Sequence, residues 1–485
     1  MRINVVINTV GIMLRYIALL MLLPVIFAFC YREYTSILPF LTGSLMSLIF
    51  GGLFSLNKAS EKDIDTVNKP EALGIALFAW MFFALVASIP YLFYNLGVVN
   101  SLFEAVSGVS TTGATILKDF SIYPKTFFFY RSMTQWFGGM GIIVLFIAVL
   151  PKFSVAGRQM FFAENPNPAE EKVTPRVRHT ASWLWGIYLG LTVLQVIILK
   201  LAGLDFYNSI CTAFSTVGAG GFSPNGDSII GYNNAIITAI IMVFAFLAGT
   251  NFILMYKFFV QRKFSAPLKS EEFITYVAVT LILGLLIAFS LCKNMGYLPR
   301  EGLLAGLFQT ISIMTSTGFA SSDFGDWDFS SKLLLLLPMF IGASAISACG
   351  GLKITRWIFV FKYIKRELCK IIHPKGVYPI RLEGSVVNPE TAQQMMAFVI
   401  FYFALFGVSA FIVGFIEQNV SVAIVGSIAS LGNVGPGFGA IGPLNHFADL
   451  NTATKFIFMF NMLVGRLELI PFLAILHKDF WAVKK

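Results

Sequence analysis

Four short stretches of similar outline, each centred on one glycine, recur along the chain at intervals of roughly 100 residues. They are Thr111-Thr112-Gly113, Thr216-Val217-Gly218, Ser316-Thr317-Gly318 and Asn433-Val434-Gly435. A short apolar segment precedes each stretch. Ten helical residues reach about 15 Å, half the thickness of a bilayer core, so such a segment enters a membrane but cannot cross it. The repeat therefore predicts four pore loops in one chain.

Long apolar segments flank every glycine turn. The chain of 485 residues is 57% hydrophobic and 12% charged, too little polar surface for a soluble globule of this size. Segments of 18 or more largely uncharged residues predict membrane-spanning helices, and the absence of period-two alternation argues against a β-barrel. The expected spans are 5–30, 37–56, 72–94, 127–150, 181–202, 234–256, 273–292, 333–361, 396–416 and 454–476.

These segments predict an all-α polytopic membrane protein with an N-terminal transmembrane hairpin and four helix/pore-loop/helix units around one central pore. The hairpin is outside the repeat and is expected to serve packing. The predicted boundaries are 1–70 for the hairpin, 71–165 for unit 1, 166–265 for unit 2, 266–385 for unit 3 and 386–485 for unit 4.

Basic residues are unevenly distributed between the two predicted membrane sides. Most of the 35 Lys and Arg residues are on the side opposite the glycine turns. By the positive-inside bias that side is cytoplasmic, together with both termini, and the glycine turns face outward. This placement explains the net charge of +10 without nucleic acid as a partner.

The glycine turns have the chemistry of a filter for a monovalent cation. Backbone carbonyls replace the hydration shell of potassium, and glycine allows successive carbonyls to point inward. Thr111, Thr216, Ser316 and Asn433 can add side-chain oxygens at the inner end. No turn holds a carboxylate, which argues against a divalent-cation filter. Because only the second turn approaches the Thr-Val-Gly form of potassium channels, we expect potassium and rubidium to pass better than sodium, with modest discrimination.

A gate is expected below the filter. The second span of unit 3 contains a run of small residues at 342–351, which is either a close packing face or an unwound segment. Arg466 is at mid-depth in the last span and needs acceptors, which free carbonyls of an unwound segment would supply. Glu468 is expected to pair with Lys353. The expected gating residues are Gly342, Ser344, Ser347, Gly350, Gly351, Lys353, Arg466 and Glu468.

Several motifs together resemble the Trk/Ktr/HKT potassium transporter superfamily, and the opening hairpin makes the bacterial TrkH branch the nearest match. The motifs are Gln135-Trp136-Phe137-Gly138-Gly139-Met140-Gly141-Ile142-Ile143-Val144, the four glycine turns, Gly350-Gly351-Leu352-Lys353 and Gly465-Arg466-Leu467-Glu468. The resemblance implies a homodimer in the bacterial inner membrane, with one pore per protomer. It also implies cytoplasmic TrkA-like subunits that bind nucleotides and control the gate.

Two other function classes are open to the sequence. A symporter that couples potassium to protons or sodium would need intramembrane carboxylates or histidines, for which Glu468 and Glu104 are the candidates. An enzyme would need a nucleophile with a base, or a set of metal ligands, and the four histidines have no such spacing. The sequence thus favours a non-enzymatic, channel-like pore that binds potassium and carries no organic cofactor.

Overall fold

The chain forms a bundle of helices in which four units surround a centre rich in loops. The structure, a computed structural model, describes residues 1–56, 67–141, 177–467, 472 and 477–481. Its helices fill most of the described chain, and the sheet among these residues is one antiparallel hairpin in which Arg381 pairs with Val386. The all-α architecture expected from the sequence is confirmed.

The elements follow the repeat. The opening hairpin comprises α1 (Ile3–Leu20), α2 (Leu23–Cys30), η1 (Tyr34–Ser36) and α3 (Ile37–Ser55). Unit 1 comprises α5 (Lys69–Leu92), α6 (Val98–Val109) and α7 (Lys125–Gly139). Unit 2 comprises α10 (Val177–Leu201), α11 (Phe206–Val217), η4 (Ile230–Tyr232), α12 (Ala235–Ala248) and α13 (Phe252–Phe259), and α14 (Ala266–Lys269) begins unit 3.

Units 3 and 4 complete the bundle. Unit 3 also comprises α15 (Glu271–Met295), α16 (Pro299–Met314), α17 (Phe329–Ile341), α18 (Ile354–Ile372), β1 (Arg381–Leu382) and β2 (Ser385–Val386). Unit 4 comprises α19 (Pro389–Glu417), the π-helical turn η5 (Val422–Gly426), α20 (Ser427–Leu431), η6 (Gly439–Ile441) and α21 (Thr452–Leu467), with α23 (Lys478–Trp481) after it.

Polar side chains fix where several helices begin. Asn68 and Glu71 form a capping box at the start of α5, each accepting from the other's backbone N–H. Asp205 caps α11, and Asp328 caps α17 by accepting from two backbone N–H groups of its first turn. These caps satisfy amide groups that have no partner inside the helix, so the helices start at defined residues.

The second span of unit 2, expected to be continuous over 234–256, is broken. The axis bends by 100° between α12 and α13. Asn251 at the break accepts hydrogen bonds from the backbone N–H groups of Ile253 and Leu254 and so caps a new helix. The prediction of a continuous span was wrong because the long apolar flanks keep the mean hydropathy of the whole segment high, although Gly249-Thr250-Asn251 favour a cap.

Helix length agrees with a membrane protein. Among the described residues, six helices are long and apolar enough to cross a bilayer, and a seventh results if α12 and α13 count as one span. The predicted spans 127–150 and 454–476 extend beyond the described residues, so only their first parts, α7 and α21, are seen.

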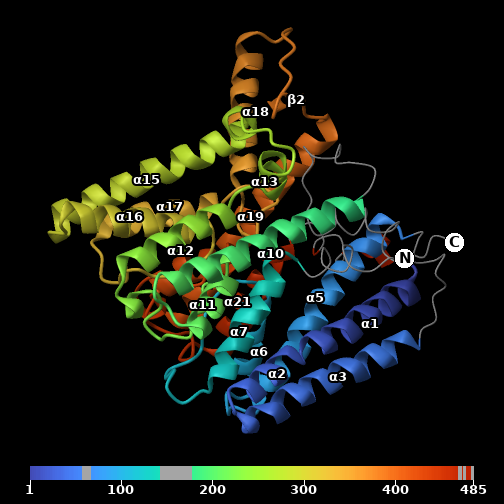
Figure 1. Cartoon of the computed structure of the whole chain (residues 1–485). Coiled ribbons are helices and arrows are strands. Elements are labelled where there is room, and N and C mark those ends of the chain that lie inside the picture. Colours follow the sequence, from blue (N-terminus) through green and yellow to red (C-terminus); the bar gives the residue numbers. More distant parts are fainter. Residues whose placement is uncertain (57–66, 142–176, 468–471, 473–476, 482–485) are drawn as a thin grey trace.

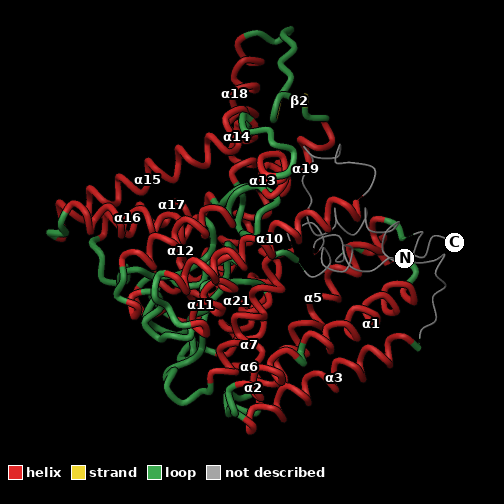
Figure 2. The backbone as a smooth tube through the Cα atoms, in the orientation of Figure 1, coloured by secondary structure: helices red, strands yellow, loops and turns green. Residues whose placement is uncertain are grey.

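Loops lie inside the helix bundle as well as at its surface. Figure 1 places α1, α3 and α5 together on one side, α15 and α16 on the other, and α18 with the β hairpin projecting at one end. Helix α15 packs against α16 and α17, and α1 packs against α3 and α5. Figure 2 shows loop segments among the helices in the middle of the molecule and towards its lower left. Irregular backbone at this depth is tolerated where it is buried in protein or lines water.

Candidate ion-conduction site

Four short helices end at the loop-rich centre, each followed by the same backbone conformation. After α6, α16 and α20, a residue with positive φ is followed two positions later by a glycine with positive φ. The pairs are Thr111 (57°) with Gly113 (81°), Ser316 (50°) with Gly318 (74°), and Asn433 (53°) with Gly435 (92°). A left-handed residue costs free energy unless it is glycine, so three repetitions of this pattern mark a constrained structure.

In unit 2 the same conformation occurs three residues later than the predicted turn. The pair with positive φ is Ala219 (55°) and Gly221 (74°). Thr216 and Val217 form the last turn of α11, and Gly218 is its C-cap with φ of −69°. The assignment of Thr216, Val217 and Gly218 to the turn was therefore wrong.

Backbone hydrogen bonds confirm the shift. After each short helix, one backbone N–H donates to the carbonyl of a residue near the end of that helix. The donor is the positive-φ glycine in unit 3 and the residue before that glycine in the other three units. The bonds are Thr112 N to Ser107 O, Gly220 N to Ser215 O, Gly318 N to Ser312 O and Val434 N to Ala429 O. Gly220 thus corresponds to Thr112, and Gly221 to Gly113. A sequence signal existed, because Gly221-Phe222 matches Gly318-Phe319.

The four glycines form a closed ring. A Cβ atom on each would overlap a backbone carbonyl oxygen of the next unit, in the order 1, 2, 3, 4 and back to 1. The contacts pair Gly113 with Gly220 O, Gly221 with Thr317 O, Gly318 with Val434 O and Gly435 with Thr112 O. No larger residue fits without displacing a carbonyl, so the ring itself requires glycine at these four positions.

Polar side chains brace the first three ring segments from behind. The Ser107 hydroxyl donates to Ala114 O at 2.6 Å, and the Ser312 hydroxyl donates to Phe319 O at 2.6 Å. In unit 2 the amide of Gln135, from α7 of unit 1, donates to Gly220 O at 2.6 Å and accepts from Phe222 N at 3.0 Å. Buried carbonyls are thereby held in fixed directions.

A cavity of about 290 Å³ opens onto the ring from one side. Gly113, Gly221 and Gly318 line its floor, and Lys118 is among the residues of its wall. Lys118 Nζ is 2.5 Å from a carboxylate oxygen of Asp449. This hydrogen bond lowers the pKa of the Asp449 carboxyl, so the group is ionised at neutral pH. The cavity has the position of a vestibule to the ring.

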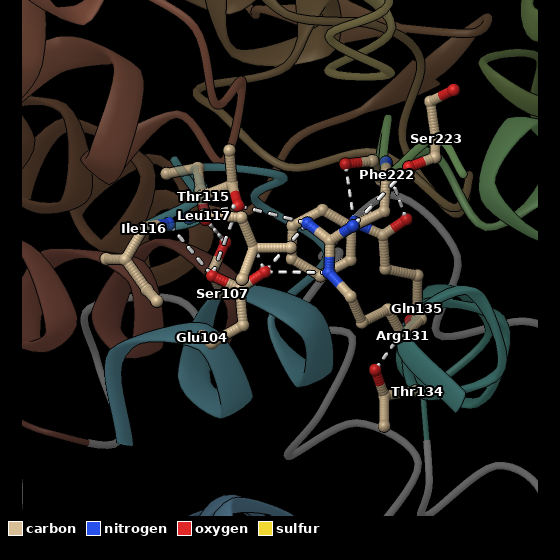
Figure 3. A network of polar contacts seen from close by, with 12 residues as sticks. Glu104, Ser107, Thr115, Ile116, Leu117, Arg131, Thr134, Gln135, Phe222 and Ser223 are labelled. Carbon is tan, nitrogen blue, oxygen red and sulfur yellow. Dashed lines mark hydrogen bonds and ion pairs between the residues drawn. The ribbon is translucent and has the colours of Figure 1, made fainter. Parts of the chain in front are cut away.

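Behind the first and second ring segments is a buried ion pair (Figure 3). Arg131 of α7 and Glu104 of α6 approach to 2.7 Å, and their side chains are 1% and 0% exposed. Glu104 also accepts from Ile116 N at 3.0 Å. Arg131 donates to the Thr115 hydroxyl at 3.1 Å and to Ser223 O at 3.4 Å. The sequence reading placed Glu104 in the short helix but did not find its partner.

On the other side of the ring, the small-residue run of unit 3 is unwound. Residues 342–353 are non-helical between α17 and α18. Of the two structures that the sequence allowed, the unwound segment is therefore the one observed. We call residues 342–351 the intramembrane loop. Gly342, Ile346, Gly351 and Lys353 have positive φ. Gly350 N donates to the Ser316 hydroxyl at 2.9 Å, so the loop touches the third ring segment directly.

The intramembrane loop is held by the break between α12 and α13. Ser344 N donates to Gly249 O at 3.1 Å, and Ala348 N donates to Ala248 O at 3.3 Å. Phe252 N donates to Ile346 O at 3.0 Å, and within the loop the Ser347 hydroxyl donates to Ser344 O. The two irregular segments therefore satisfy each other's backbone groups, which neither could do in lipid.

Arg466 of α21 reaches the intramembrane loop. Its guanidinium donates to Ala348 O at 2.6 Å and to Gly138 O at 2.5 Å, and also to Gly139 O. The contact of Arg466 with a loop carbonyl was predicted, but its contacts with the two carbonyls at the end of α7 were not. Glu468 is outside the described residues, so its expected pairing with Lys353 has no structural counterpart here.

A second charged side chain that the sequence reading missed contacts the loop from α15. The buried Glu272 carboxylate accepts from Ala345 N at 2.5 Å, from the Thr355 hydroxyl at 2.6 Å and from the Asn251 amide at 3.2 Å. It thus joins the loop to α18 and to the α13 cap. Glu272 is close in sequence to the polar end of its span, so hydropathy alone gave no signal for this role.

The chain as a whole is similar to known membrane transport proteins. The sequence model of a family described as TrkH, cation transport protein, matches residues 39–480. The chain belongs to the TrkH family. A relative in Vibrio parahaemolyticus, the Trk system potassium uptake protein TrkH, is 34% identical over 493 residues, covering 99% of this chain and all of that protein.

Other TrkH proteins agree. The Trk system potassium uptake protein TrkH of Escherichia coli K12 is 32% identical over 488 residues, with 99% of this chain and 100% of that protein covered. The crystal structure of the potassium transporter TrkH from Vibrio parahaemolyticus superposes with a TM-score of 0.88 at 31% identity, over 99% of this chain and 100% of that chain. The fold of this TrkH family member is thus that of a cation transporter, and the family is not one of enzymes.

Proposed function

We propose that this protein takes up potassium through a channel-like pore whose filter is the ring of Gly113, Gly221, Gly318 and Gly435. The observation that carries the proposal is the cyclic contact of each glycine with a carbonyl of the next unit. Carbonyl rings of this kind substitute for the hydration shell of potassium. The names of the relatives, potassium uptake proteins, support potassium as the cargo.

Electrostatics around the ring supports a monovalent cation. The short helices α6, α11, α16 and α20 all end at the ring, so their negative dipole ends favour a cation there. No carboxylate belongs to any ring segment. Because the four segments differ in sequence, we expect rubidium to pass like potassium and sodium to be excluded only in part.

The intramembrane loop and Arg466 form the proposed gate. Gly350 contacts the third ring segment, and the Arg466 guanidinium bonds to Ala348 O. A fixed positive charge below the filter opposes cation passage, and the loop occupies the path until it moves. Gly342, Ser344, Ser347, Gly351 and Lys353 are proposed to allow that movement.

The cellular setting follows from the family and the charge distribution. We place the protein in a bacterial inner membrane, in contact with lipid, with the vestibule outside and both termini in the cytoplasm. A homodimer with one pore in each protomer, controlled by cytoplasmic TrkA-like nucleotide-binding subunits, completes the proposal.

Flux and density measurements test the filter together. In proteoliposomes we expect potassium and rubidium uptake that exceeds sodium uptake. In a structure determined in potassium we expect ion density enclosed by the carbonyls of Thr112, Gly220, Thr317 and Val434. Equal sodium and potassium flux, or density elsewhere in the pore, would contradict the assignment.

A symporter remains the second candidate because Glu104 and Glu272 are carboxylates buried among the helices. Glu104 is committed to an ion pair and Glu272 to three donors, an arrangement that does not favour proton relay. A reversal potential that follows potassium alone supports the pore. A shift of that potential with pH or with sodium at constant potassium would support coupled transport instead.

A further inference from the structure

We propose that the Glu104–Arg131 ion pair positions the first and second filter segments relative to each other and thereby sets the discrimination between potassium and sodium. The inference rests on the filter proposed above. It assigns to two side chains behind the ring, neither of which touches the ion, a role in specificity. Figure 3 shows the Arg131 guanidinium between Thr115 and Phe222, with Glu104 on the Thr115 side.

Glu104 holds the chain that leaves the first ring glycine. Its carboxylate accepts from Ile116 N at 3.0 Å and from the Thr115 hydroxyl at 3.2 Å, which are three and two residues beyond Gly113, respectively. It comes from α6, the short helix that enters the same segment. The carboxylate thus ties both ends of the first filter loop together.

Arg131 extends this connection to the second segment. One face of the guanidinium is 3.9 Å from the centre of the Phe222 ring, and Nη1 donates to Ser223 O at 3.4 Å. Nε and Nη2 point the other way, to Glu104 at 2.8 Å and to Thr115 at 3.1 Å. The planar, forked guanidinium can contact both segments at once, which an ammonium group cannot.

The second segment depends on this support more than the first and third do. Ser107 and Ser312 tie the first and third segments to their own short helices. The corresponding Ser215 hydroxyl makes no hydrogen bond among the described residues. Gln135 and Arg131, one turn apart on α7, contact the second segment in its place. Helix α7 of unit 1 is therefore the scaffold for the filter segment of unit 2.

A buried ion pair is a poor way to gain stability, since well-packed apolar side chains of similar volume often do as well. The advantage of such an ion pair is a fixed geometry, because charge-assisted hydrogen bonds are short and orient both partners. Small changes in the spacing of carbonyls alter how well they replace the hydration of potassium against sodium. The pair is suited to specificity rather than to stability alone.

The test uses the full-length protein in proteoliposomes and the Arg131→Lys variant. Lysine keeps the charge beside Glu104 but loses the second arm of the fork. We expect potassium flux to persist while the permeability ratio of potassium to sodium, from bi-ionic potentials, falls by about fivefold, at the lower end of usual coupling free energies. Glu104→Gln, which keeps an acceptor for Ile116 N but removes the charge, should lower the same ratio.

Arg366→Lys is the matched control, because it makes the same exchange in an Arg–Glu ion pair, with Glu367 on α18, that belongs to neither the ring nor the vestibule. It should leave the ratio unchanged. A wild-type ratio in both Arg131→Lys and Glu104→Gln would overturn the inference and leave the filter standing. Loss of folding in both variants, judged by gel filtration, would also overturn it by making the pair a folding element. Absence of selective potassium flux in the wild-type protein would instead refute the proposed function.

Discussion

At the scale of single residues, the decisive features are backbone conformations that side chains cannot reveal. Gly221 has φ of +74° and would place a Cβ against Thr317 O, whereas Gly218 is helical. Both glycines are enclosed, since a Cβ on Gly218 would lie 2.7 Å from Phe214 O. Only Gly221, however, meets a carbonyl of the ring. This contact distinguishes Gly221, a glycine of the ring, from Gly218, which is enclosed by other backbone atoms three residues earlier.

Substitution of Gly221 by alanine should damage conduction. The added methyl overlaps Thr317 O, and the left-handed backbone costs about 1 kcal/mol without glycine. We expect loss of potassium selectivity, or of flux altogether, in rubidium uptake assays. Gly203→Ala is the matched control, because Gly203 also has positive φ (99°) but nothing within 4 Å of an added Cβ. Equal behaviour of the two variants would count against the ring.

The corrected position also makes a prediction for Gly218. Its close neighbours are backbone atoms of α11 and α7, so Gly218→Ala should lower stability by about 1–3 kcal/mol through overpacking. The protein that does fold should retain wild-type selectivity. Thermal unfolding in detergent and bi-ionic potentials measure the two effects. A selectivity change in Gly218→Ala with unchanged stability would restore the original assignment.

At the scale of elements, two interrupted spans complement each other. The loop between α17 and α18 supplies N–H groups to Ala248 O and Gly249 O, and the α12–α13 break supplies Phe252 N in return. Each interruption would leave unsatisfied backbone groups by itself. Glu272 and Arg466 contact this shared structure from outside, one through a backbone N–H and the other through a carbonyl. The proposed gate thus combines backbone groups of units 2 and 3 with the Arg466 side chain of unit 4.

Removal of the Glu272 carboxylate should loosen the loop. Glu272→Ala leaves Ala345 N and the Thr355 hydroxyl without their acceptor, a loss of about 1–3 kcal/mol. We expect higher basal rubidium flux in the absence of regulatory subunits, and Glu272→Gln to be milder. Glu71→Ala is the control, since Glu71 is equally buried but caps α5 away from the loop. Similar flux in Glu272→Ala and Glu71→Ala would exclude a latch.

Removal of the Arg466 guanidinium should open the gate more directly. Arg466→Ala abolishes the bond to Ala348 O and removes a positive charge below the ring. Basal flux should rise by about fivefold or more, at the lower end of usual coupling free energies. Deletion of 344–348 should have the same direction. Arg15→Ala, in the exposed face of α1, serves as control. Unchanged flux in both the Arg466 variant and the deletion would dismiss the gate.

At the scale of the whole molecule, the four units close into a ring that no unit forms alone. Each ring glycine belongs to one unit and its carbonyl neighbour to the next. An ion bound at the centre therefore links all four units. A ligand that binds only the folded state raises the free energy of unfolding by an amount that grows with the logarithm of ligand concentration above the dissociation constant.

Potassium should accordingly raise the unfolding temperature of the purified protein. At a concentration 100 times the dissociation constant, the free energy of unfolding increases by about 2.7 kcal/mol. We expect potassium and rubidium to stabilise more than sodium, and choline not at all, in thermal unfolding at constant ionic strength. Gly203→Ala should keep this response and Gly221→Ala should lose it. An equal response to all four cations would indicate a salt effect rather than a site.

The sequence alone determined the membrane class and the four units, because hydropathy is a local property. It also indicated the unwound loop at 342–351 and the need of Arg466 for carbonyl acceptors, because a run of small residues and a charge within a span are visible locally. Tertiary structure decided which glycine of the second segment joins the ring, where α12 breaks, and that Arg131 pairs with Glu104. Thr-Val-Gly at 216–218 has the composition of a filter, yet Gly220 N bonds to Ser215 O and carries the turn three residues onward. The contact of Gly221 with the carbonyl of Thr317 in unit 3, and the pairing of Arg131 with Glu104, depend on tertiary packing that composition and local spacing do not specify.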